Sequence, residues 1–280
     1  MHCRALQRGC ASMNARHTLG FMETQTGAQV TRSDAVYLEK RGHIAELVLN
    51  RPAVLNAENW QMAHAFHAAL DELEKTAEIR AVVVTGQGRS FSSGIDLRAL
   101  AGGELDISWF RSFDEAMRRL EQLDALTVAK MRGYAIGGGL QIALACDLRI
   151  AAPDTKVGLP AVMEALIPGM GTYRLPRFIG LGRARRLVLT GELMGAEEAL
   201  RIGLLDWVVP EEKLDETVDS VIAGVLKGSP TAQAFSKKLV TAAFERDFDS
   251  AFSEYLDYQQ QSLRSSDHEK AMAEYRNRKK

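Results

Sequence analysis

Apolar and polar positions alternate or cluster in several short segments of the first half of the chain. Residues 36–50, VYLEKRGHIAELVLN, alternate on either side of Gly42, which predicts a β-hairpin. Residues 81–85, AVVVT, form a continuous apolar run that is typical of a buried strand. Similar runs within residues 125–136 and at 149–152 predict further strands.

Helical spacing separates these strands. Apolar residues between Trp60 and Leu73 recur every three or four positions, which predicts a helix that is capped by Asn56 and ends near Ala77. Residues 140–148, LQIALACDL, have the length and all-round apolar character of a buried helix. Strands and helices therefore alternate, and we predict an α/β fold in which helices cover a sheet.

The two ends of the chain differ from its middle. The first 34 residues carry several arginines and no acidic residue before Glu23, which fits a disordered extension or an organelle transit peptide. After Ala184 the chain is mainly helical, with breaks at glycines and at Pro210. We therefore expect an extension at residues 1–34, a core at 35–200 and a C-terminal helical region at 201–280.

The charge pattern bears on possible binding partners, and the cysteine count bears on the cellular compartment. The 35 basic and 36 acidic residues are interspersed along the 280-residue chain, so no face is obviously built for nucleic acid or anionic lipid. No apolar run approaches the roughly 20 residues of a membrane span. The odd count of three cysteines favours a reducing compartment, either the cytoplasm or an organelle matrix. His64 and His67 lack a nearby acidic or cysteine cluster, so we expect no metal site.

Two glycine-containing turns carry the main chemical signal. In SFSSGIDL, Gly94 follows a predicted strand and lets the N–H group of Ile95 face outward. In AIGGGLQ, residues 137–139 are three glycines at the start of a predicted helix, where N–H groups are unpaired and the helix dipole is positive. Two such N–H groups that converge on one oxygen would form an oxyanion hole.

From Val36 to the C-terminus, the sequence resembles the crotonase, or enoyl-CoA hydratase/isomerase, superfamily. The matching motifs stand in the family's order: LNRPAVLNA, SFSSGIDL, GYAIGGGLQIALACDLRIA, GLPAVMEALIPGMGTYRLPRFIG and LTGELMGAEEALRIGLLDWVV. The resemblance implies a spiral of ββα units and C-terminal helices that assemble trimers, often paired into hexamers. It also implies an acyl-CoA thioester substrate, so coenzyme A enters as part of the substrate and no separate cofactor is expected.

The resemblance also implies which residues form the site. The oxyanion donors would be the backbone N–H groups of Ile95 and Gly138. The coenzyme A site would lie along two segments, at Ala53, Val54, Leu55, Ser93, Asp96 and Leu97.

The sequence departs from the family at both glutamates that hydratases use to position and deprotonate water. These positions are Gln141 and Ala161 here. An amide orients water but cannot accept its proton, and alanine does neither. Because each missing acid or base costs roughly 10²–10⁴ in rate, we expect standard hydration to be severely impaired.

Glu164, three residues after Ala161, is the acidic residue that could compensate. If Pro160 begins an α-helix, the two positions lie about 4.5 Å apart along its axis. A helix cap or a surface ion pair explains this glutamate equally well. Weaker candidates for the catalytic base are Asp114, Glu115 and Tyr134.

Three classes of function follow from these residues. The first is an enzyme that isomerises a double bond through a stabilised enolate, because this reaction needs one base, Glu164, rather than two. The second is a hydratase that has rebuilt its water site from Gln141 and Glu164. The third is a non-catalytic acyl-CoA-binding protein.

Overall fold

The computed structural model describes residues 35–278, so the extension expected at residues 1–34 lies outside the described residues. The described chain begins with an antiparallel hairpin of strands β1 (Val36–Arg41) and β2 (Ile44–Leu49). Gly42 lies in its turn with a φ of 59°, a left-handed conformation that glycine adopts without steric cost. The hairpin predicted around Gly42 is therefore confirmed.

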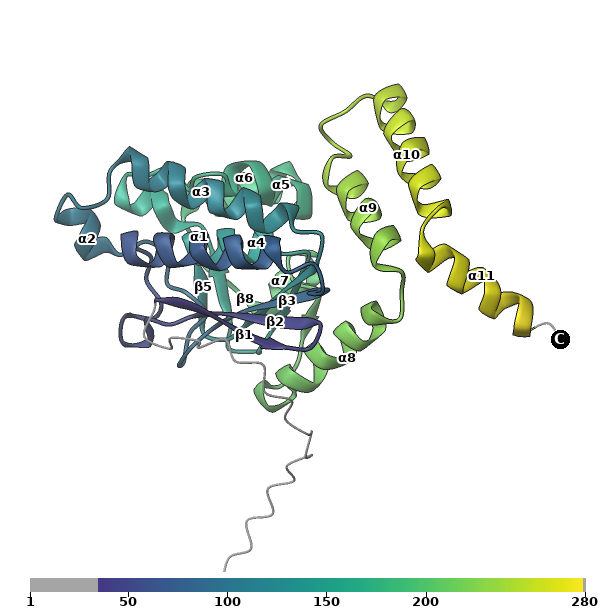
Figure 1. Cartoon of the computed structure of the whole chain (residues 1–280). Coiled ribbons are helices and arrows are strands. Elements are labelled where there is room, and N and C mark those ends of the chain that lie inside the picture. The colour runs from purple at the N-terminus through teal and green to yellow at the C-terminus, as the bar shows by residue number, and fades with distance from the viewer. Residues whose placement is uncertain (1–34, 279–280) are drawn as a thin grey trace, which may run out of the picture.

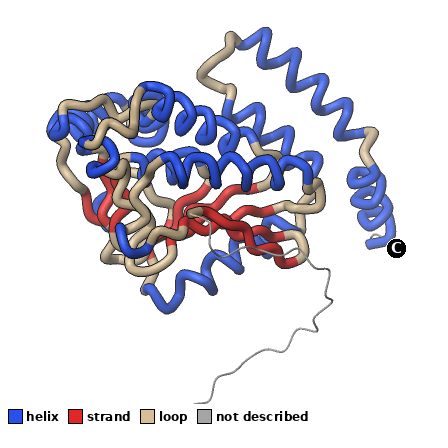
Figure 2. Tube along the Cα trace, turned by 60° about the vertical axis from the view of Figure 1, so that its left-hand side comes forward, coloured by secondary structure: helices blue, strands red, loops and turns tan. Residues whose placement is uncertain are grey.

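The hairpin is one edge of a six-stranded sheet with the order β1-β2-β3-β4-β6-β9 (Figures 1 and 2). All pairs after β1 and β2 are parallel. A smaller sheet has the order β5-β7-β8. The remaining strands are β3 (Ala81–Gly86), β4 (Leu126–Met131), β5 (Tyr134–Ile136), β6 (Leu148–Ala151), β7 (Lys156–Gly158), β8 (Met194–Gly195) and β9 (Trp207–Val208).

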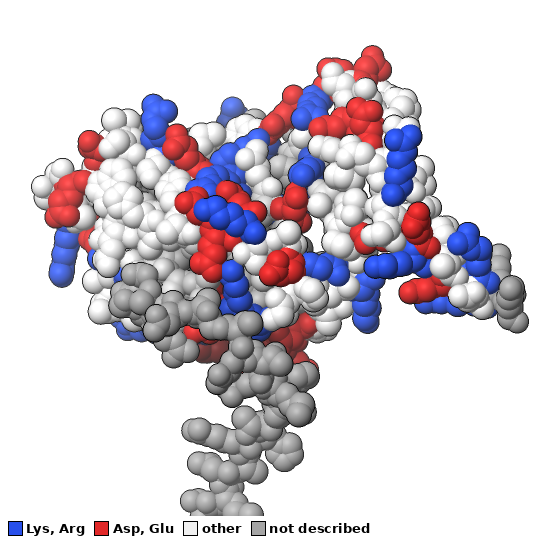
Figure 3. All heavy atoms as spheres, in the orientation of Figure 1, with Lys and Arg blue, Asp and Glu red and all other residues white. Residues whose placement is uncertain are grey.

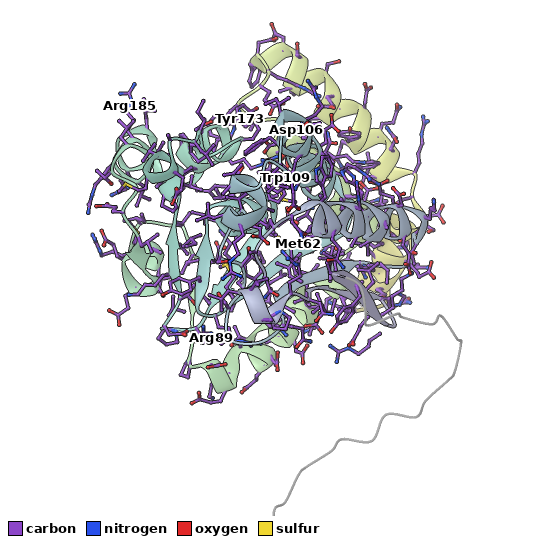
Figure 4. All side chains as sticks on the ribbon, turned by 90° about the vertical axis from the view of Figure 1, so that its left-hand side faces the viewer. Met62, Arg89, Asp106, Trp109, Tyr173 and Arg185 are labelled. Atoms are coloured by element: carbon purple, nitrogen blue, oxygen red, sulfur yellow. The ribbon has the colours of Figure 1, made fainter. Side chains whose placement is uncertain are left out.

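Helices cover both faces of the large sheet, as expected for parallel strands that are buried on both sides. One face carries α1 (Trp60–Lys75), α3 (Ile107–Gln122) and α4 (Gly138–Ala145), and α8 (Leu214–Leu226) lies on the other (Figure 1). Figure 4 shows Trp109 of α3 above Met62 of α1, and both side chains are buried in the larger core. The mixed α/β architecture predicted from the sequence is thereby confirmed.

The predicted cap of α1 is wrong. Asn59, not Asn56, caps the helix, and its side chain accepts a 3.1 Å hydrogen bond from the N–H group of Met62. Asn56 is fully buried with a φ of 55°. Its side-chain amide instead donates to three carbonyl groups of the loop after β3, those of Gln87, Ser90 and Phe91. These tertiary bonds fix the loop that leads to Gly94.

The chain after Ala184 is mainly helical, as predicted, although β9 completes the large sheet beyond residue 200. Helices α9 to α11 stand beside the core rather than on it (Figures 1 and 2). No helix in the described range is long and apolar enough to cross a membrane. The remaining helices are η1 (Pro52–Val54), α2 (Leu97–Ala101), η2 (Pro160–Glu164), α5 (Gly171–Ile179), α6 (Leu181–Thr190), α7 (Ala196–Arg201), η3 (Glu211–Lys213), α9 (Pro230–Thr241), α10 (Phe248–Leu263) and α11 (Ser266–Arg278).

Candidate active site

The two glycine-containing turns meet in the structure. Gly94 and Gly137 have φ angles of 86° and 57°, in the left-handed region that favours glycine. A Cβ atom on Gly94 would lie only 2.9 Å from the carbonyl oxygen of Ile136 and 3.3 Å from the nitrogen of Gly138. The absence of side chains therefore lets the two backbones touch, which brings the peptide groups of Ile95 and Gly138 together.

Both of these peptide N–H groups are available to a ligand. Within the described part of the chain, neither Ile95 nor Gly138 donates a hydrogen bond from its backbone. Gly138 is the first residue of α4, whose positive dipole end favours a developing negative charge. Two such donors can bind one carbonyl oxygen and stabilise it as an oxyanion.

The two donors border a cavity of about 160 Å³. Its walls are mostly apolar, with aromatic side chains from α3 and apolar residues from the segment after η2. Trp109, which Figure 4 labels, is one of these aromatic residues. The polar residues among its lining residues are Glu58, Ser93, Asp114, Gln141 and Glu164.

Gln141 projects from α4 and is buried, with 7% of its surface exposed. Its side-chain oxygen accepts a 3.1 Å hydrogen bond from the N–H group of Gly171. No hydrogen bond from its amide nitrogen occurs among the described residues, so that group can serve a ligand. Ala161, at the other hydratase position, lines the same cavity and contributes no polar group.

Asp114 lies near Gln141, beside Gly169. A Cβ atom on Gly169 would lie 2.8 Å from Oε1 of Gln141 and 3.0 Å from Oδ2 of Asp114, so both side chains flank this glycine. Asp114 is half-buried, and this burial raises the pKa of its carboxyl group above the ordinary value. A carboxyl group and an amide therefore lie beside the same glycine, and the carboxyl group also accepts a 3.3 Å hydrogen bond from the N–H group of Met170.

Glu164 is the last residue of η2, which Pro160 begins. Because η2 is a 3₁₀ helix, Glu164 lies about 6 Å from Ala161 along the axis, farther than in an α-helix, and on the same side. The side chain is exposed, and it makes no hydrogen bond or ion pair within residues 35–278. It does not cap the helix, because it stands at the C-terminal end.

Glu58 is a site residue that the sequence analysis missed. Its side chain is almost completely buried, with 1% exposed, and Oε1 accepts a 2.8 Å hydrogen bond from the hydroxyl group of Ser92. Burial raises the pKa of Glu58 to about 8. In sequence this glutamate resembles an ordinary polar residue ahead of a helix cap. Its pairing with Ile95, thirty-seven positions away, is what buries it.

Comparison with known proteins identifies the family of the chain. Residues 39–280 match the family model described as enoyl-CoA hydratase/isomerase. The chain belongs to the enoyl-CoA hydratase/isomerase family. The short-chain-enoyl-CoA hydratase of Clostridium acetobutylicum is 36% identical over 222 residues, covering 77% of this chain and 84% of that protein. The crotonyl-CoA hydratase of Syntrophomonas wolfei is 33% identical over 222 residues, covering 78% and 85%.

Solved structures of the family share the fold. Pseudomonas aeruginosa DspI superposes with a TM-score of 0.82 at 31% identity and covers 91% of this chain and 98% of that one. The enoyl-CoA hydratase from Bacillus anthracis gives a TM-score of 0.83 at 28% identity, with 88% and 97% covered. The predicted crotonase fold is therefore confirmed.

The residues that the family resemblance assigned to coenzyme A differ in their position, since Ala53, Val54, Leu55 and Asp96 are not among the described residues that line the cavity. Ser93 and Leu97 line it, and the N–H group of Ser93 donates to the carbonyl group of Leu55 at 2.9 Å. Ala53 and Val54 belong to η1 next to Leu55.

Asp96 has structural partners. It caps α2 and forms a 3.2 Å ion pair with Arg51. Its carboxylate thus ties the segment around η1 to the turn of Ile95.

Of the three weaker candidates for the catalytic base, only one lines the cavity. Among the described lining residues, Asp114 is present, whereas Glu115 and Tyr134 are not. Glu115 faces a separate hollow on the outer side of α3, and Tyr134 lies in β5 with 43% of its surface exposed.

Proposed function

We propose that this family member binds an acyl-CoA thioester, stabilises its enolate through Ile95 and Gly138, and shifts a carbon–carbon double bond of the acyl group. The observation that carries the proposal is the pair of unengaged N–H groups at one cavity, combined with Gln141 and Ala161 at the hydratase positions. The cavity is smaller than the roughly 300–1,000 Å³ of sites for drug-sized ligands, which supports a short acyl group in it.

The two N–H groups supply the electrostatic part of the reaction. Removal of an α-proton places negative charge on the thioester oxygen, and fixed donors stabilise that charge without having to reorganise. Loss of one such donor costs about 3–4 kcal/mol of barrier in well-studied enzymes. The dipole of α4 acts in the same direction.

Glu164 is the proposed base. Its carboxylate lines the cavity and has no competing partner within the described residues. Isomerisation requires one carboxylate to remove the proton from the α-carbon of a 3-enoyl group and return it to the γ-carbon. A residue at the rim of the cavity, without fixed hydrogen bonds, has the freedom to serve both carbon atoms.

Hydration is the second candidate function, and one observation favours it specifically. Gln141 and Asp114 flank Gly169, so an amide and a carboxyl group with a raised pKa could hold and deprotonate one water. The similar proteins from C. acetobutylicum and S. wolfei are named hydratases. In this alternative, Asp114 takes the role that the sequence analysis gave to Glu164.

Turnover of 2-enoyl- and 3-enoyl-CoA substrates by three proteins separates these functions. We expect the wild type to isomerise a 3-enoyl-CoA. Glu164→Gln should lower that rate by about 10²-fold or more, because it keeps the size but removes the basicity. Asp114→Asn is the matched variant and should retain most of the activity.

Two outcomes would contradict the proposal. If the wild type hydrates 2-enoyl-CoA rapidly and only Asp114→Asn loses activity, the reaction is hydration with Asp114 as base. If calorimetry detects thioester binding but no enoyl-CoA turns over, the protein is a binding protein.

The assembly is also part of the proposal. Helix α10 has no buried residue, yet it presents Phe248, Phe252, Tyr255 and Leu256 at its surface. A second and third copy of this chain would cover this apolar stripe, which supports a trimer or a dimer of trimers.

A further inference from the structure

We propose that Phe110 of α3 limits the length of the acyl group, because its side chain stands between the cavity and a second hollow on the outer side of α3. This inference rests on the proposed function of the same site, and it names the substrates as short-chain acyl-CoA thioesters.

The cavity and the outer hollow meet at one wall. The cavity measures about 160 Å³ and the outer hollow about 570 Å³. Among the described residues, only Phe110 and Asp114 line both of them. These two residues are four positions apart on α3, so their side chains are neighbours on one face of the helix. An acyl chain that extended from the cavity into the outer hollow would have to pass these two side chains.

A hydrogen bond closes the Asp114 part of the wall. The N–H group of Met170 donates to Oδ1 of Asp114 at 3.3 Å. Gly169 lines the cavity and Met170 lines the outer hollow, so the backbone passes from one space to the other at this bond. Asp114 thereby ties α3 to the segment after η2. Phe110 is the part of the wall that a side chain closes by its size alone.

Neighbouring aromatic rings hold Phe110 in place. Its ring lies edge-on to that of Trp109, with a centroid distance of 5.1 Å and an interplanar angle of 83°. This geometry is one that aromatic pairs favour. Trp109 also stacks on Phe113 at 5.3 Å, and both of these residues are buried. An alkyl chain that displaced the ring of Phe110 would therefore break its contact with a buried aromatic pair.

The polarity of the two spaces changes at this wall. The cavity is mostly apolar, whereas most residues around the outer hollow are charged, namely Arg111, Asp114, Glu115, Arg118, Glu121, Arg174 and Glu245. An alkyl chain gains free energy when it is buried against apolar groups, but charged groups that it covers lose water. Size and polarity therefore both favour an acyl group that ends at Phe110.

Calorimetry with butyryl-, hexanoyl- and octanoyl-CoA tests the length limit without turnover. We expect the wild type to bind octanoyl-CoA about ten-fold or more weakly than butyryl-CoA, because a chain that overfills a packed site strains it. Phe110→Ala removes the ring and joins the two spaces. Its affinity for octanoyl-CoA should rise about ten-fold or more, since each methylene group that becomes buried contributes about four-fold. Its affinity for butyryl-CoA should change less.

Two further variants complete the series. Arg111→Ala is the matched control, because Arg111 is an exposed residue next to Phe110 that lines only the outer hollow. It should bind all three thioesters as the wild type does. Phe110→Trp enlarges the wall and should weaken the binding of hexanoyl-CoA about ten-fold, with a smaller effect on butyryl-CoA. This variant also provides the test if Phe110→Ala fails to fold.

The ratio of octanoyl-CoA affinity to butyryl-CoA affinity separates a length limit from a structural role. Partial unfolding removes binding sites for every thioester equally, so it leaves this ratio unchanged. The ratio of kcat/KM for 3-octenoyl-CoA to that for 3-hexenoyl-CoA should rise in Phe110→Ala and fall in Phe110→Trp.

The outcomes distinguish this inference from the function on which it rests. If the wild type binds octanoyl-CoA as tightly as butyryl-CoA, or if both Phe110 variants keep the wild-type ratio, Phe110 sets no limit and the proposed function stands. If the wild type binds none of the thioesters, the proposed function is wrong and the length limit falls with it. If the expected affinities are found but no 3-enoyl-CoA turns over, the length limit stands and the proposed reaction is wrong.

Discussion

Single residues decide which chemistry the site supports. Some of them could be identified from the sequence, and others could not. Ile95 and Gly138 could be located because the glycines beside them are a local signal of a turn. Glu58 could not, because its burial arises from pairing with a residue far along the chain. Asn56 and Asn59 are equally good caps by type, and only tertiary hydrogen bonds to the loop after β3 assign their roles.

At this scale, the pKa of Glu58 predicts how stability depends on pH. The folded protein holds the Glu58 proton up to about pH 8, whereas the unfolded chain releases it near the ordinary value of 4.5. The stability from this group is therefore full below pH 4.5 and is lost as pH rises to about 8. The loss is on the order of 5 kcal/mol.

Urea unfolding at pH 5 and pH 8.5 checks this effect. Glu58→Gln does not titrate, so the free energy of unfolding of the wild type should fall relative to this variant between the two pH values. An equal difference at both pH values would mean that Glu58 is already ionised in the folded protein.

Two short helices, α4 and η2, carry Gly138, Gln141, Ala161 and Glu164 of the candidate site. The motif preceding α4 specified its start, and the structure has the helix at Gly138–Ala145. The segment at Pro160 was harder to predict, because a proline start fits both α and 3₁₀ geometry. Its 3₁₀ form places Glu164 farther from Ala161 along the axis than an α-helix would. Asp114 therefore has to be considered beside Glu164 as the base.

The contact between the two turns predicts a selective effect of adding one methyl group. Gly94→Ala would press a Cβ atom against the carbonyl oxygen of Ile136, 2.9 Å away, and displace the donors. We expect its kcat to fall by about 10²-fold or more. Gly42→Ala is the matched control, since Gly42 also has a left-handed φ but no atom within 4 Å of the added Cβ.

Both variants bear a similar backbone strain of about 1–2 kcal/mol. Gly94→Ala adds the close contact with Ile136, so both melting temperatures should fall, that of Gly94→Ala further, while only Gly94→Ala loses activity. Equal activity of the two variants would show that the contact between the turns does not set the donor geometry.

The whole molecule is divided between a compact core and the helices α9 to α11 beside it (Figures 1 and 2). Acidic and basic side chains are interspersed over both parts of the face in Figure 3, so charge alone does not mark an interface. The apolar surface of α10 is what supports the proposed assembly, since Phe248 is 78% exposed and stacks on the half-exposed Phe252. The helical character of this region was predictable from the sequence, but its position was not, because it depends on tertiary contacts such as the 2.8 Å ion pair between Lys237 of α9 and Asp147.

Multi-angle light scattering tests the proposed assembly. We expect the mass of a trimer or hexamer at micromolar concentration. Phe252→Glu should shift the mass toward the monomer, because it places a charge within the apolar stripe. Gln261→Glu, an exposed position on the opposite side of α10, should leave the mass unchanged. A monomeric wild type would contradict the assembly.

Enolate stabilisation is the central claim, and exchange of α-protons tests it most directly. Butyryl-CoA has no double bond to move or hydrate, so incubation in D₂O with the protein isolates proton removal at the α-carbon, which NMR detects as loss of the C2 signal. The account predicts exchange well above the rate without protein, reduced about 10²-fold or more in Gly94→Ala and retained in Gly42→Ala. Binding of butyryl-CoA with no exchange above background, or equal exchange in both glycine variants, would contradict the account.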